Sequence, residues 1–342
     1  MSRLLVLAVV LFAAVTGRAD GRVRQSPDRA VSLAQGPEAL LAGQVMAVAY
    51  SGFREGQHPD RGEGAVNPTR EQVLEDLQIL AGRGFHLVRM YDSGENTETA
   101  LDLIREHGLP IKVLLGIWLQ AEVSNHEGCA WLTEPIPAAT LAENALENAA
   151  EVDRGIALAL RFPGIVVAVN VGNEALVDWN DHMVPLEQVI AYVRRVKARI
   201  EQPVTVADNY AWWAHSGTPL AAEIDFIGVH TYPQWEGKTV DEALAFTIEN
   251  VAAVRAALPG KPIVILEAGW ATVASEFGER ASEAYQARHF AELRDWASTN
   301  NTTVFWFEAF DEPWKGDPSN PLGAEKHWGL FTVDRRPKQS MK

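Results

Sequence analysis

Short apolar segments alternate with longer amphipathic segments from about residue 40 almost to the end of the chain. The apolar segments are rich in Val and Ile, which is typical of strands that are buried on both faces. The segments between them carry apolar residues three or four positions apart, as in Val73, Leu77 and Leu80, and this spacing predicts helices. Because strands that alternate with helices pair in parallel through right-handed crossovers, we expect an α/β fold.

Eight of the apolar segments are predicted to be strands. They are residues 44–50, 86–91, 111–117, 165–171, 204–207, 226–230, 262–267 and 303–307. Eight strand–helix units in a chain of 342 residues predict a single (β/α)8 TIM barrel over residues 40–342. An open doubly wound sheet is the competing architecture. It normally has a glycine-rich phosphate loop after an early strand, and the sequence has neither Gly-x-Gly-x-x-Gly nor a Walker-type loop.

The first residues have the pattern of a secretory signal peptide. Arg3 precedes an apolar stretch from Leu4 to Val15, and the small residues Gly17 and Ala19 suit a cut after Ala19. We expect residues 1–19 to be removed and residues 20–39 to form a flexible mature N-terminus. The protein would then be exported to a periplasm or out of the cell. An uncleaved anchor is the lesser alternative, because the apolar stretch is short for a bilayer.

Charge and residue usage limit the possible partners. A net charge of −15 argues against binding to nucleic acid or to an anionic membrane, which both favour clusters of Lys and Arg. Cys129 is the only cysteine, so no intrachain disulfide can form, and it has no obvious base that would make it a nucleophile. The nine His lack the spacing of a metal site. We expect a neutral ligand, no metal or other cofactor, and a monomer without membrane contact after cleavage.

The stretch from Ile165 to Val177 begins with an apolar run. This run ends abruptly at Gly172-Asn173-Glu174. Ligands bind at the carboxyl ends of strands in parallel α/β folds. A carboxylate at this point can be a proton donor, and the amide beside it can bond a substrate hydroxyl. Asn173 and Glu174 could instead cap the next turn, because Asn is a good N-cap and Glu suits a first helical turn.

Glu267 also ends an apolar strand, the seventh in the predicted order. The fourth and seventh strands lie on opposite sides of a closed barrel, so Glu174 and Glu267 can face each other across one bound sugar. Glycoside hydrolysis requires such a pair, with one carboxyl protonated and the other ionised. The structural alternative for Glu267 is an ion pair inside the barrel mouth.

Tryptophan is concentrated near the predicted strand ends. Ten of the eleven Trp lie at or after such an end, and only Trp296 is predicted to lie in a helix. Core filling would spread the Trp over the helices and both ends of the barrel, so the pattern favours a cleft with aromatic platforms for sugar rings. The residues predicted to bind substrate are Tyr50, Tyr91, Asn173, Asp208, Tyr210, His230, Tyr232, Trp235, Trp270, Glu308, Glu312, Trp314 and Lys315. For His230, a bond to substrate or to a catalytic carboxylate and a purely structural role both remain open.

At these motifs the chain resembles glycoside hydrolase family 17, the β-1,3-glucanase and glucanosyltransferase family. Val171-Gly-Asn-Glu174 is similar to the acid/base motif of that family, and Leu266-Glu267-Ala-Gly-Trp270 is similar to its nucleophile motif. Phe307-Glu308-Ala-Phe-Asp-Glu312-Pro-Trp-Lys315, with His327-Trp-Gly-Leu-Phe331 behind it, is similar to the signature of the eighth strand. The resemblance covers about residues 44–335.

The resemblance implies that Glu174 is the acid/base, that Glu267 is the nucleophile, and that Glu312 and Lys315 are polar supports. It also implies a β-glucan substrate and retention of configuration, with carboxyl groups roughly 5 Å apart. We therefore expect a retaining hydrolase of β-1,3-glucan. A glucanosyltransferase that uses the same carboxylates is the alternative, and a glucan-binding barrel without turnover is a second one.

Two segments depart from the familiar plant pattern of that family. The nucleophile motif continues Glu-Ala-Gly-Trp-Ala-Thr where the plant form has Glu-Ser-Gly-Trp-Pro-Ser, and this difference bears on fine subsite specificity. Residues 232–237, Tyr-Pro-Gln-Trp-Glu-Gly, are closer to the fungal and bacterial branches, of which we expect the bacterial one. Those branches include enzymes that rearrange glucan chains.

Overall fold

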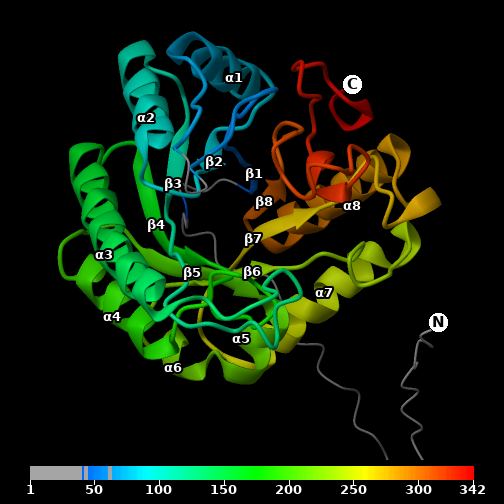
Figure 1. Ribbon diagram of the computed structural model, residues 1–342. Coiled ribbons are helices and arrows are strands. Elements are labelled where there is room, and N and C mark those ends of the chain that lie inside the picture. Colours follow the sequence, from blue (N-terminus) through cyan, green and yellow to red (C-terminus); the bar gives the residue numbers. More distant parts are fainter. Residues whose placement is uncertain (1–40, 42–44, 61–63) are drawn as a thin grey trace, which may run out of the picture. The chain divides into compact units, whose positions relative to one another are not determined.

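The computed structural model describes residues 41, 45–60 and 64–342, all within the unit Leu33–Lys342 (Figure 1). In this part of the chain, eight parallel strands close into a barrel, because each strand pairs with the next and β8 pairs with β1. The strands are β1 Met46–Ala49, β2 Leu87–Arg89, β3 Lys112–Ile117, β4 Val166–Asn173, β5 Val204–Asn209, β6 Ile227–His230, β7 Ile263–Gly269 and β8 Val304–Phe307. The predicted single (β/α)8 barrel is confirmed, and every predicted strand is present with ends that agree within about two residues.

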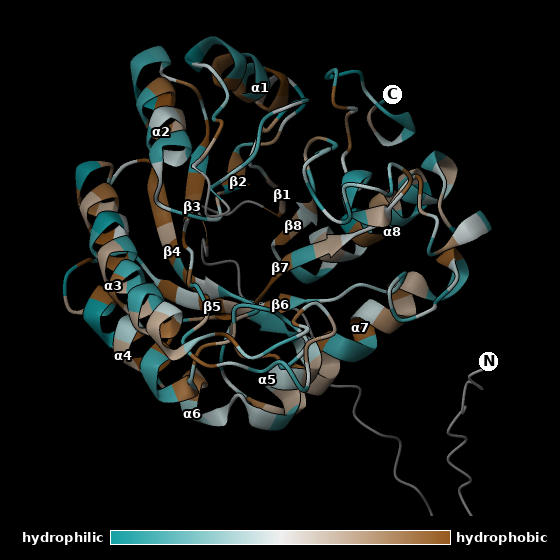
Figure 2. Ribbon diagram, in the orientation of Figure 1, coloured by the Kyte–Doolittle hydropathy of each residue, from teal (hydrophilic) through white to brown (hydrophobic). Residues whose placement is uncertain are grey.

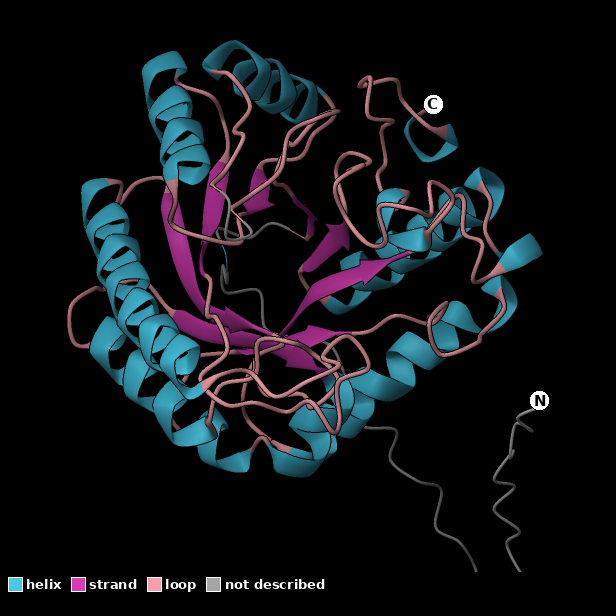
Figure 3. Cartoon of the chain, in the orientation of Figure 1, coloured by secondary structure: helices cyan, strands magenta, loops and turns pink. Residues whose placement is uncertain are grey.

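The helices form the layer outside the strands, as Figure 3 shows. They are α1 Arg70–Gly82, α2 Glu95–His107, α3 Ala138–Arg161, α4 Leu186–Lys197, α5 Tyr210–Ser216, α6 Thr218–Ala221, α7 Val240–Ala257 and α8 Glu283–Asn300. Short 3-10 turns are η2 Gly278–Arg280, η3 Ala324–Lys326 and η4 Gln339–Met341. Helix α5 begins directly after β5 and contains Trp212 and Trp213. The prediction that Trp296 alone lies in a helix is therefore wrong.

Side-chain caps fix where several helices begin. Thr69 and Gln72 form a capping box at the start of α1, in which the Gln72 amide N–H donates to the Thr69 hydroxyl. Helix α7 begins with the equivalent pair, Thr239 and Glu242. At the start of α5 the Asn209 side chain accepts a hydrogen bond from the Ala211 backbone. These caps place the start of each helix, and so set the length of the loop that precedes it on the carboxyl side of the barrel.

Two apolar layers hold the barrel together. The strands of the barrel contribute a small cluster of buried residues that contact one another across its interior, including Ala47, Leu87, Leu114, Ala168 and Phe305. A larger cluster lies between the strands and the helices. Figure 2 shows the corresponding pattern, with apolar strands inside and polar outward faces on the helices. Because the interior is packed with side chains, a ligand has room only at the ends of the barrel.

The predicted signal peptide, residues 1–19, and the predicted mature N-terminal segment, residues 20–39, lie outside the described residues. Within the part that the structure describes, none of the helices combines the length and the apolar character that crossing a membrane requires.

Candidate active site

Both candidate carboxylates are associated with an irregular part of a strand. Glu267 lies within one, and Glu174 directly follows another. Between Ile265 and Ala268, β7 contains one more residue than the facing part of β8, and Glu267 lies in this interval. Strand β4 has a similar extra residue against β5 just before Glu174, between Asn170 and Asn173. A bulge changes the direction in which the following side chains point. Both carboxylates are therefore aimed by local strand geometry at the carboxyl end of the barrel.

Glu174 has a left-handed backbone conformation, with φ of 48°. This conformation is uncommon outside glycine and is found at functional sites where neighbouring bonds hold it. The Glu174 amide donates to the Ala207 carbonyl at 2.8 Å, and the Asn180 side chain donates to the Glu174 carbonyl at 3.1 Å. The Asn180 amide group also lies 3.3 Å from Oε2 of Glu174. The backbone of Glu174 is thus fixed from both sides.

Asp208 stabilises the turn that carries Glu174. Its carboxylate is fully buried and accepts hydrogen bonds from the backbone amides of Leu176 and Asn209, at 3.0 and 2.8 Å. Burial, followed by the negative charge of Glu174, raises the pKa of Asp208 well above its usual value. Asp208 holds the turn that carries Glu174 and has no surface that faces a ligand.

Three side chains donate to Glu267. Arg89 Nη1 lies 2.8 Å and the Tyr91 hydroxyl 2.9 Å from Oε1, and the Tyr232 hydroxyl lies 2.5 Å from Oε2. Burial alone raises the pKa of Glu267, but the electrostatic effects of His230 and Arg89 and the two tyrosine bonds outweigh it. The pKa of Glu267 is therefore lower than usual, and this carboxylate is kept ionised.

The two tyrosines remain hydrogen-bond donors at any ordinary pH. Burial and the nearby charge of Glu267 raise the pKa of Tyr91 and of Tyr232 well above the usual value. Tyr232 is held in place by edge contacts with Phe307 and Trp328, whose ring centroids lie 5.8 and 5.3 Å away. Glu267 thus has two neutral donors and one permanent cation around it.

His230 connects the two carboxylates. Its Nε2 lies 3.1 Å from Arg89 Nη1, and its Nδ1 lies 2.9 Å from Glu174 Oε1 and 3.5 Å from Glu267 Oε2. An arginine can only donate, so in the neutral form of the ring we assign the lone pair to Nε2 and the proton to Nδ1. His230 therefore donates toward Glu174. Of the two roles left open by the sequence, the structure places His230 on a candidate catalytic carboxylate.

Oxygen and nitrogen atoms of Glu174, His230 and Glu267 all lie within 4.8 Å of one another. Such a group could in principle hold a metal ion. Arg89, however, donates to both Glu267 and His230, and its positive charge would repel a divalent cation at this point. The arrangement suits proton transfer and nucleophilic chemistry better, and the absence of a metal stays a prediction.

A second charged cluster follows β8. Lys315 bonds Glu308 and lies 3.0 Å from Glu312 Oε2. Burial lowers the pKa of Lys315, but the charges of Glu308 and Glu312 outweigh this effect and raise it. Glu312 also accepts from the Ser51 hydroxyl at 2.9 Å and from the Trp314 indole at 3.1 Å. This network ties the β8 loop to the loop that follows β1.

The structure separates the predicted binding residues into two groups. Those with at least a partly accessible side chain are Tyr91, Asn173, Tyr210, Tyr232, Trp235, Trp314 and Lys315. Those with 1% or less of their surface accessible are Tyr50, Asp208, His230, Trp270, Glu308 and Glu312. A side chain without accessible surface cannot contact a sugar, so direct binding by the second group is contradicted.

Two of the buried residues point toward the helix layer. The Tyr50 hydroxyl donates to Asp76 of α1 at 3.3 Å, and the Trp270 ring lies 5.7 Å from that of His289 in α8. Four of the eleven Trp are fully buried: Trp213, Trp270, Trp306 and Trp328. The concentration of Trp near the strand ends therefore reflects core filling as well as the lining of a cleft.

The exposed Trp lie on loops at the carboxyl ends of the strands. Trp131 is 78% exposed, Trp179 45% and Trp235 46%. Trp235 is fixed by an edge contact with Phe277, at 4.6 Å between ring centroids. Tyr210 makes a similar contact with Phe246 of α7, at 5.8 Å. Trp235 and Tyr210 are thus the better-supported aromatic platforms.

Three residues near the carboxylates were not predicted as site residues. Arg89 could have been found, because a charged residue at the end of an apolar strand requires a buried partner. Asn180 shows no signal in the sequence. Glu325 in η3 lies close enough to Glu267 and Glu174 to feel their charges. Burial, opposed by Lys315 and reinforced by these two carboxylates, raises the pKa of Glu325 to about 7.

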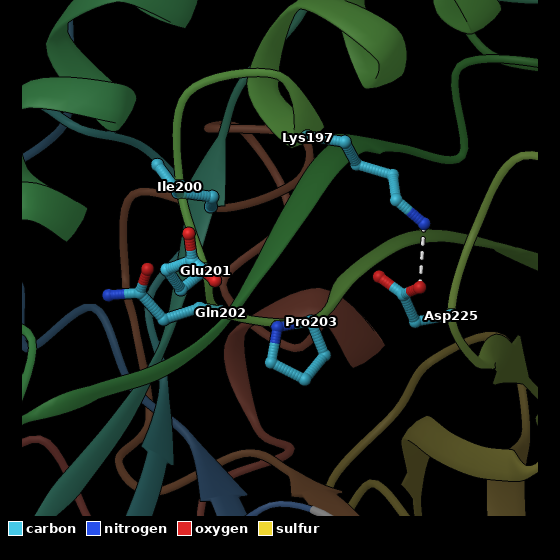
Figure 4. A pocket seen from close by; sticks show the side chains of 6 residues that line it. All are labelled: Lys197, Ile200, Glu201, Gln202, Pro203 and Asp225. Atoms are coloured by element: carbon cyan, nitrogen blue, oxygen red, sulfur yellow. Dashed lines mark hydrogen bonds and ion pairs between the residues drawn. The ribbon is translucent and has the colours of Figure 1, made fainter.

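Two cavities lie away from the carboxylates. One of about 380 Å³ lies at the amino end of β5, where Lys197 Nζ bonds Asp225 at 2.6 Å (Figure 4). This is the end of the barrel opposite to the candidate site. The other, of about 370 Å³, lies among the loops that follow β1 and β2 and is lined in part by Phe53 and Asn96.

Comparison with known families gives one match over most of the chain. Residues 47–329 match the BtgE/BtgC glycoside hydrolase domain. The matched range contains both carboxylates and all the barrel strands except Met46, the first residue of β1.

Two curated relatives and one solved structure are similar to the chain. A glucan 1,3-beta-glucosidase of Arthroderma benhamiae is 26% identical over 92% of this chain and 96% of that protein. A glucan 1,3-beta-glucosidase of Schizosaccharomyces pombe is 29% identical over 52% of this chain, and the match spans 57% of that protein. The crystal structure of an endo-laminarinase from Formosa Hel1_33_131 superposes with a TM-score of 0.73 at 28% identity, over 87% of this chain and 85% of the other.

Proposed function

Because the chain belongs to the BtgE/BtgC glycoside hydrolase domain family and is a glycosidase, we propose that it cleaves β-1,3-glucan with retention of configuration. The names of the relatives support the substrate, since they include two glucan 1,3-beta-glucosidases and an endo-laminarinase. Glu267 is the proposed nucleophile and Glu174 the proposed acid/base.

The distance between the two carboxylates carries the proposal. One oxygen of each lies within 4.8 Å of the other. Retaining glycosidases have carboxyl groups about 5–5.5 Å apart, whereas inverting enzymes need roughly 6.5–9.5 Å to fit a water between carboxylate and sugar. The short separation supports direct attack by a carboxylate on the sugar.

In the first step an oxygen of Glu267 attacks the anomeric carbon while the bond from that carbon to the glycosidic oxygen breaks. Glu174 gives its proton to the departing oxygen, so the leaving chain ends in a hydroxyl. In the second step Glu174 takes a proton from water, the water oxygen bonds the anomeric carbon, and Glu267 is released as a carboxylate. Two displacements at one carbon restore the β configuration.

The surroundings support this division of labour. Arg89, Tyr91 and Tyr232 keep Glu267 ionised, as a nucleophile must be. On Glu174, Oε1 accepts from His230 at 2.9 Å, whereas Oε2 has only the longer contact of 3.3 Å with Asn180. We place the transferable proton on Oε2, because the shorter bond occupies Oε1.

Asn173 is proposed to bind the sugar beside the reacting carbon. Its Oδ1 accepts from Arg89 Nη2 at 2.5 Å, which orients the side chain and turns its NH₂ group away from Arg89. An amide held in this way can donate to a sugar hydroxyl. Such a bond contributes most when it strengthens in the transition state.

Glucanosyl transfer is the second candidate, and the position of Trp179 favours it. Trp179 is 45% exposed and directly precedes Asn180, whose side chain contacts Glu174. Because Glu174 serves the leaving and incoming groups, an aromatic platform on the loop that carries Asn180 can hold an acceptor sugar. A held acceptor would compete with water in the second step.

Three further proposals rest on the sequence. Export rests on residues 1–19, and mass spectrometry of the secreted protein would test it, with a mature start at Asp20 expected. Assignment to glycoside hydrolase family 17 and to its bacterial branch rests on the motifs around Glu174, Glu267 and Lys315. The monomeric state is an expectation that light scattering in solution would test.

The product profile tests the proposed activity. The mature protein is incubated with one purified linear β-1,3-gluco-oligosaccharide, and the chain lengths of the products are followed. Shorter products alone indicate hydrolysis, and products longer than the substrate indicate transfer. If the substrate remains unchanged while it binds, the second alternative, a binding barrel without turnover, is correct.

A further inference from the structure

The last part of the chain forms a hairpin against the segment that follows β8. Residues 328–331 run alongside residues 308–311, and backbone hydrogen bonds of 2.9 to 3.3 Å join the two segments. The chain then turns back, and the Lys338 amide donates to the Leu330 carbonyl at 3.0 Å. In Figure 1 this end of the chain lies between α1 and α8. The C-terminal hairpin, residues 328–338, is therefore attached to the start of the loop after β8.

Arg335 lies in the turn of the C-terminal hairpin and is only 7% exposed. Its backbone is left-handed, with φ of 62°, which is uncommon for a residue other than glycine. Such a conformation persists where surrounding bonds hold it. Nη1 of Arg335 donates to the Val333 carbonyl of the same turn at 2.7 Å, and the guanidinium lies 4.4 Å from the centroid of the Phe310 ring. The turn and the direction of the Arg335 side chain are thus fixed together.

The Arg335 guanidinium joins two separate elements. Its Nε and Nη2 donate to the two carboxylate oxygens of Asp76 in α1, at 2.7 and 2.6 Å. Nη2 also donates to the Gly52 carbonyl, in the loop after β1, at 2.8 Å. The pair with Asp76 compensates a fully buried charge and so contributes to stability. The bond to Gly52 is different, because it fixes the backbone of a loop.

Both sequence neighbours of Gly52 bond Glu312 in the loop after β8. The Ser51 hydroxyl donates to Glu312 Oε2 at 2.9 Å, and the Phe53 amide donates to Glu312 Oε1 at 3.2 Å. Arg335 therefore holds the middle of a three-residue segment whose two ends hold one carboxylate. A displacement of Gly52 would carry both donors of Glu312 with it.

Glu312 in turn fixes the Lys315 amine beside the candidate active site. Nζ of Lys315 lies 3.0 Å from Glu312 Oε2 and also bonds Glu308, and the Lys315 side chain is 12% exposed. The same amine lies 4.5 Å from the centroid of the Phe307 ring, which contacts the edge of Tyr232 at 5.8 Å. If Glu312 moved, Glu308 alone would hold the amine, and its place beside Tyr232 would change.

We propose that Arg335 is a positioning residue that acts through Gly52 and Glu312 to place the Lys315 amine. This inference rests on the proposed function, with Lys315 as one of the accessible residues predicted to bind the glucan. In the described part of the chain, the bonds of the Arg335 side chain go to α1, to the loop after β1 and to its own turn. They do not reach either candidate catalytic carboxylate, so the effect of Arg335 falls on substrate binding.

Arg335→Lys separates the positioning role from the ion pair. Lysine keeps a positive charge for Asp76, but its single amine cannot reproduce the fork that reaches Asp76 and Gly52 together. We expect KM of the mature protein for a linear β-1,3-linked hexasaccharide to rise about tenfold and kcat to change by less than about threefold. A partly unfolded variant would instead show a lower kcat with an unchanged KM, because fewer molecules are active.

A double variant tests whether Arg335 acts through Lys315. Lys315→Gln removes the charged amine directly and should raise KM at least as much. If Arg335 acts by placing that amine, adding Arg335→Lys to Lys315→Gln should change KM little, whereas independent effects would multiply. Arg54→Met is the matched control. Arg54 also bonds Asp76, at 2.9 Å, but among the described residues its side chain donates only to α1, so we expect an unchanged KM.

Hydrogen exchange tests the first step without a substrate. The peptide that contains the Phe53 amide should exchange faster in Arg335→Lys than in the wild type or in Arg54→Met, because the loop after β1 has lost its anchor. Circular dichroism on each variant confirms that the barrel is intact.

The outcomes separate the positioning role from the function on which it rests. If KM of Arg335→Lys equals that of the wild type, or if its effect multiplies with that of Lys315→Gln, the positioning role is wrong and the function stands. If the wild type does not turn over the hexasaccharide, the proposed substrate is wrong. Hydrogen exchange then decides the role of Arg335 by itself, and an unchanged rate at Phe53 overturns it.

Discussion

Glu174 at the end of β4 and Glu267 in β7 are the same residue type in different surroundings. The side chain of Glu267 is 7% exposed and that of Glu174 is 21% exposed. Arg89, Tyr91 and Tyr232 donate to Glu267, whereas a histidine and an asparagine side chain approach the carboxylate of Glu174. Because both residues are Glu, their chemical difference comes from their surroundings. The hydrogen-bond donors around each carboxylate and the exposure of its side chain favour one role or the other.

The backbones of Glu267 and Glu174 are also held in different ways. Glu267 lies inside a strand between two paired neighbours, so its position is fixed by the sheet. Glu174 lies just beyond its strand in a left-handed conformation, and hydrogen bonds from the following loop hold it. A nucleophile has to be rigid, and an acid/base has to face the side where leaving and incoming groups pass.

Exchange of each carboxylate for an amide should give the largest effect. Glu267→Gln removes the proposed nucleophile, so kcat should fall by at least about 10⁴-fold for every substrate. Glu174→Gln removes only proton transfer, so kcat should fall about 10²- to 10⁴-fold on glucan and much less on an aryl glucoside whose leaving group needs no proton. Steady-state kinetics on both substrates measure this contrast. If each variant lost as much kcat on the aryl glucoside as on glucan, the two carboxylates would not differ in their roles.

Removal of the Arg89 charge should have the next largest effect. Arg89 is one of the groups that lower the pKa of Glu267, so Arg89→Met should raise that pKa. Activity that needs ionised Glu267 should then appear at higher pH, with kcat lowered about 10²-fold. The acidic limb of the pH profile of kcat/KM measures the shift.

Arg54 offers a matched control for Arg89. It bonds the buried Asp76 at 2.9 Å, outside the candidate site. Arg54→Met should leave the acidic limb in place, whatever it does to stability. If the acidic limb of the kcat/KM profile is the same in Arg89→Met as in the wild type, Arg89 does not lower the pKa of Glu267.

Loss of one hydroxyl should have a smaller effect. Tyr232→Phe keeps the ring contacts with Phe307 and Trp328 but removes the 2.5 Å bond to Glu267. We expect kcat to fall roughly tenfold, as for one hydrogen bond to a charged group. Tyr192→Phe, which removes a bond to Glu122 instead, is the control. A full rate in Tyr232→Phe would show that this donor does not matter.

Glu325→Gln should have the smallest effect, visible mainly as a function of pH. The pKa of Glu325 is about 7, so its carboxyl becomes charged between about pH 6 and pH 8, and its negative charge then acts on both carboxylates. Gln stays neutral. We expect kcat/KM of the variant to match wild type below pH 6 and to differ a few-fold above pH 8, whereas Glu279→Gln should match throughout. A ratio that does not change with pH would exclude this third carboxyl from the site.

The barrel could be predicted because its signal is local and repeated. Each strand is a short apolar run followed by helical spacing, and eight such units leave few alternatives. Glu174 and Glu267 could be identified as candidates because each interrupts or ends such a run. Their closeness follows from barrel closure, which the number of strands already implied.

The orientation of single side chains could not be predicted. Trp270 lies three residues after Glu267, yet its ring packs on His289 of α8. The extra residue in β7 changes which side chains point inward, and such a bulge leaves no mark in the hydrophobic pattern. Tyr50 was likewise expected in the cleft, although its hydroxyl reaches Asp76 of α1.

Trapping of the covalent intermediate tests the central claim most directly. The protein is incubated with an activated 2-deoxy-2-fluoro β-1,3-linked glucoside, which forms the glycosyl-enzyme faster than it breaks down, and the labelled peptide is sequenced by mass spectrometry. The account predicts the added mass on Glu267. A label on Glu174, or on any other carboxylate, would contradict it.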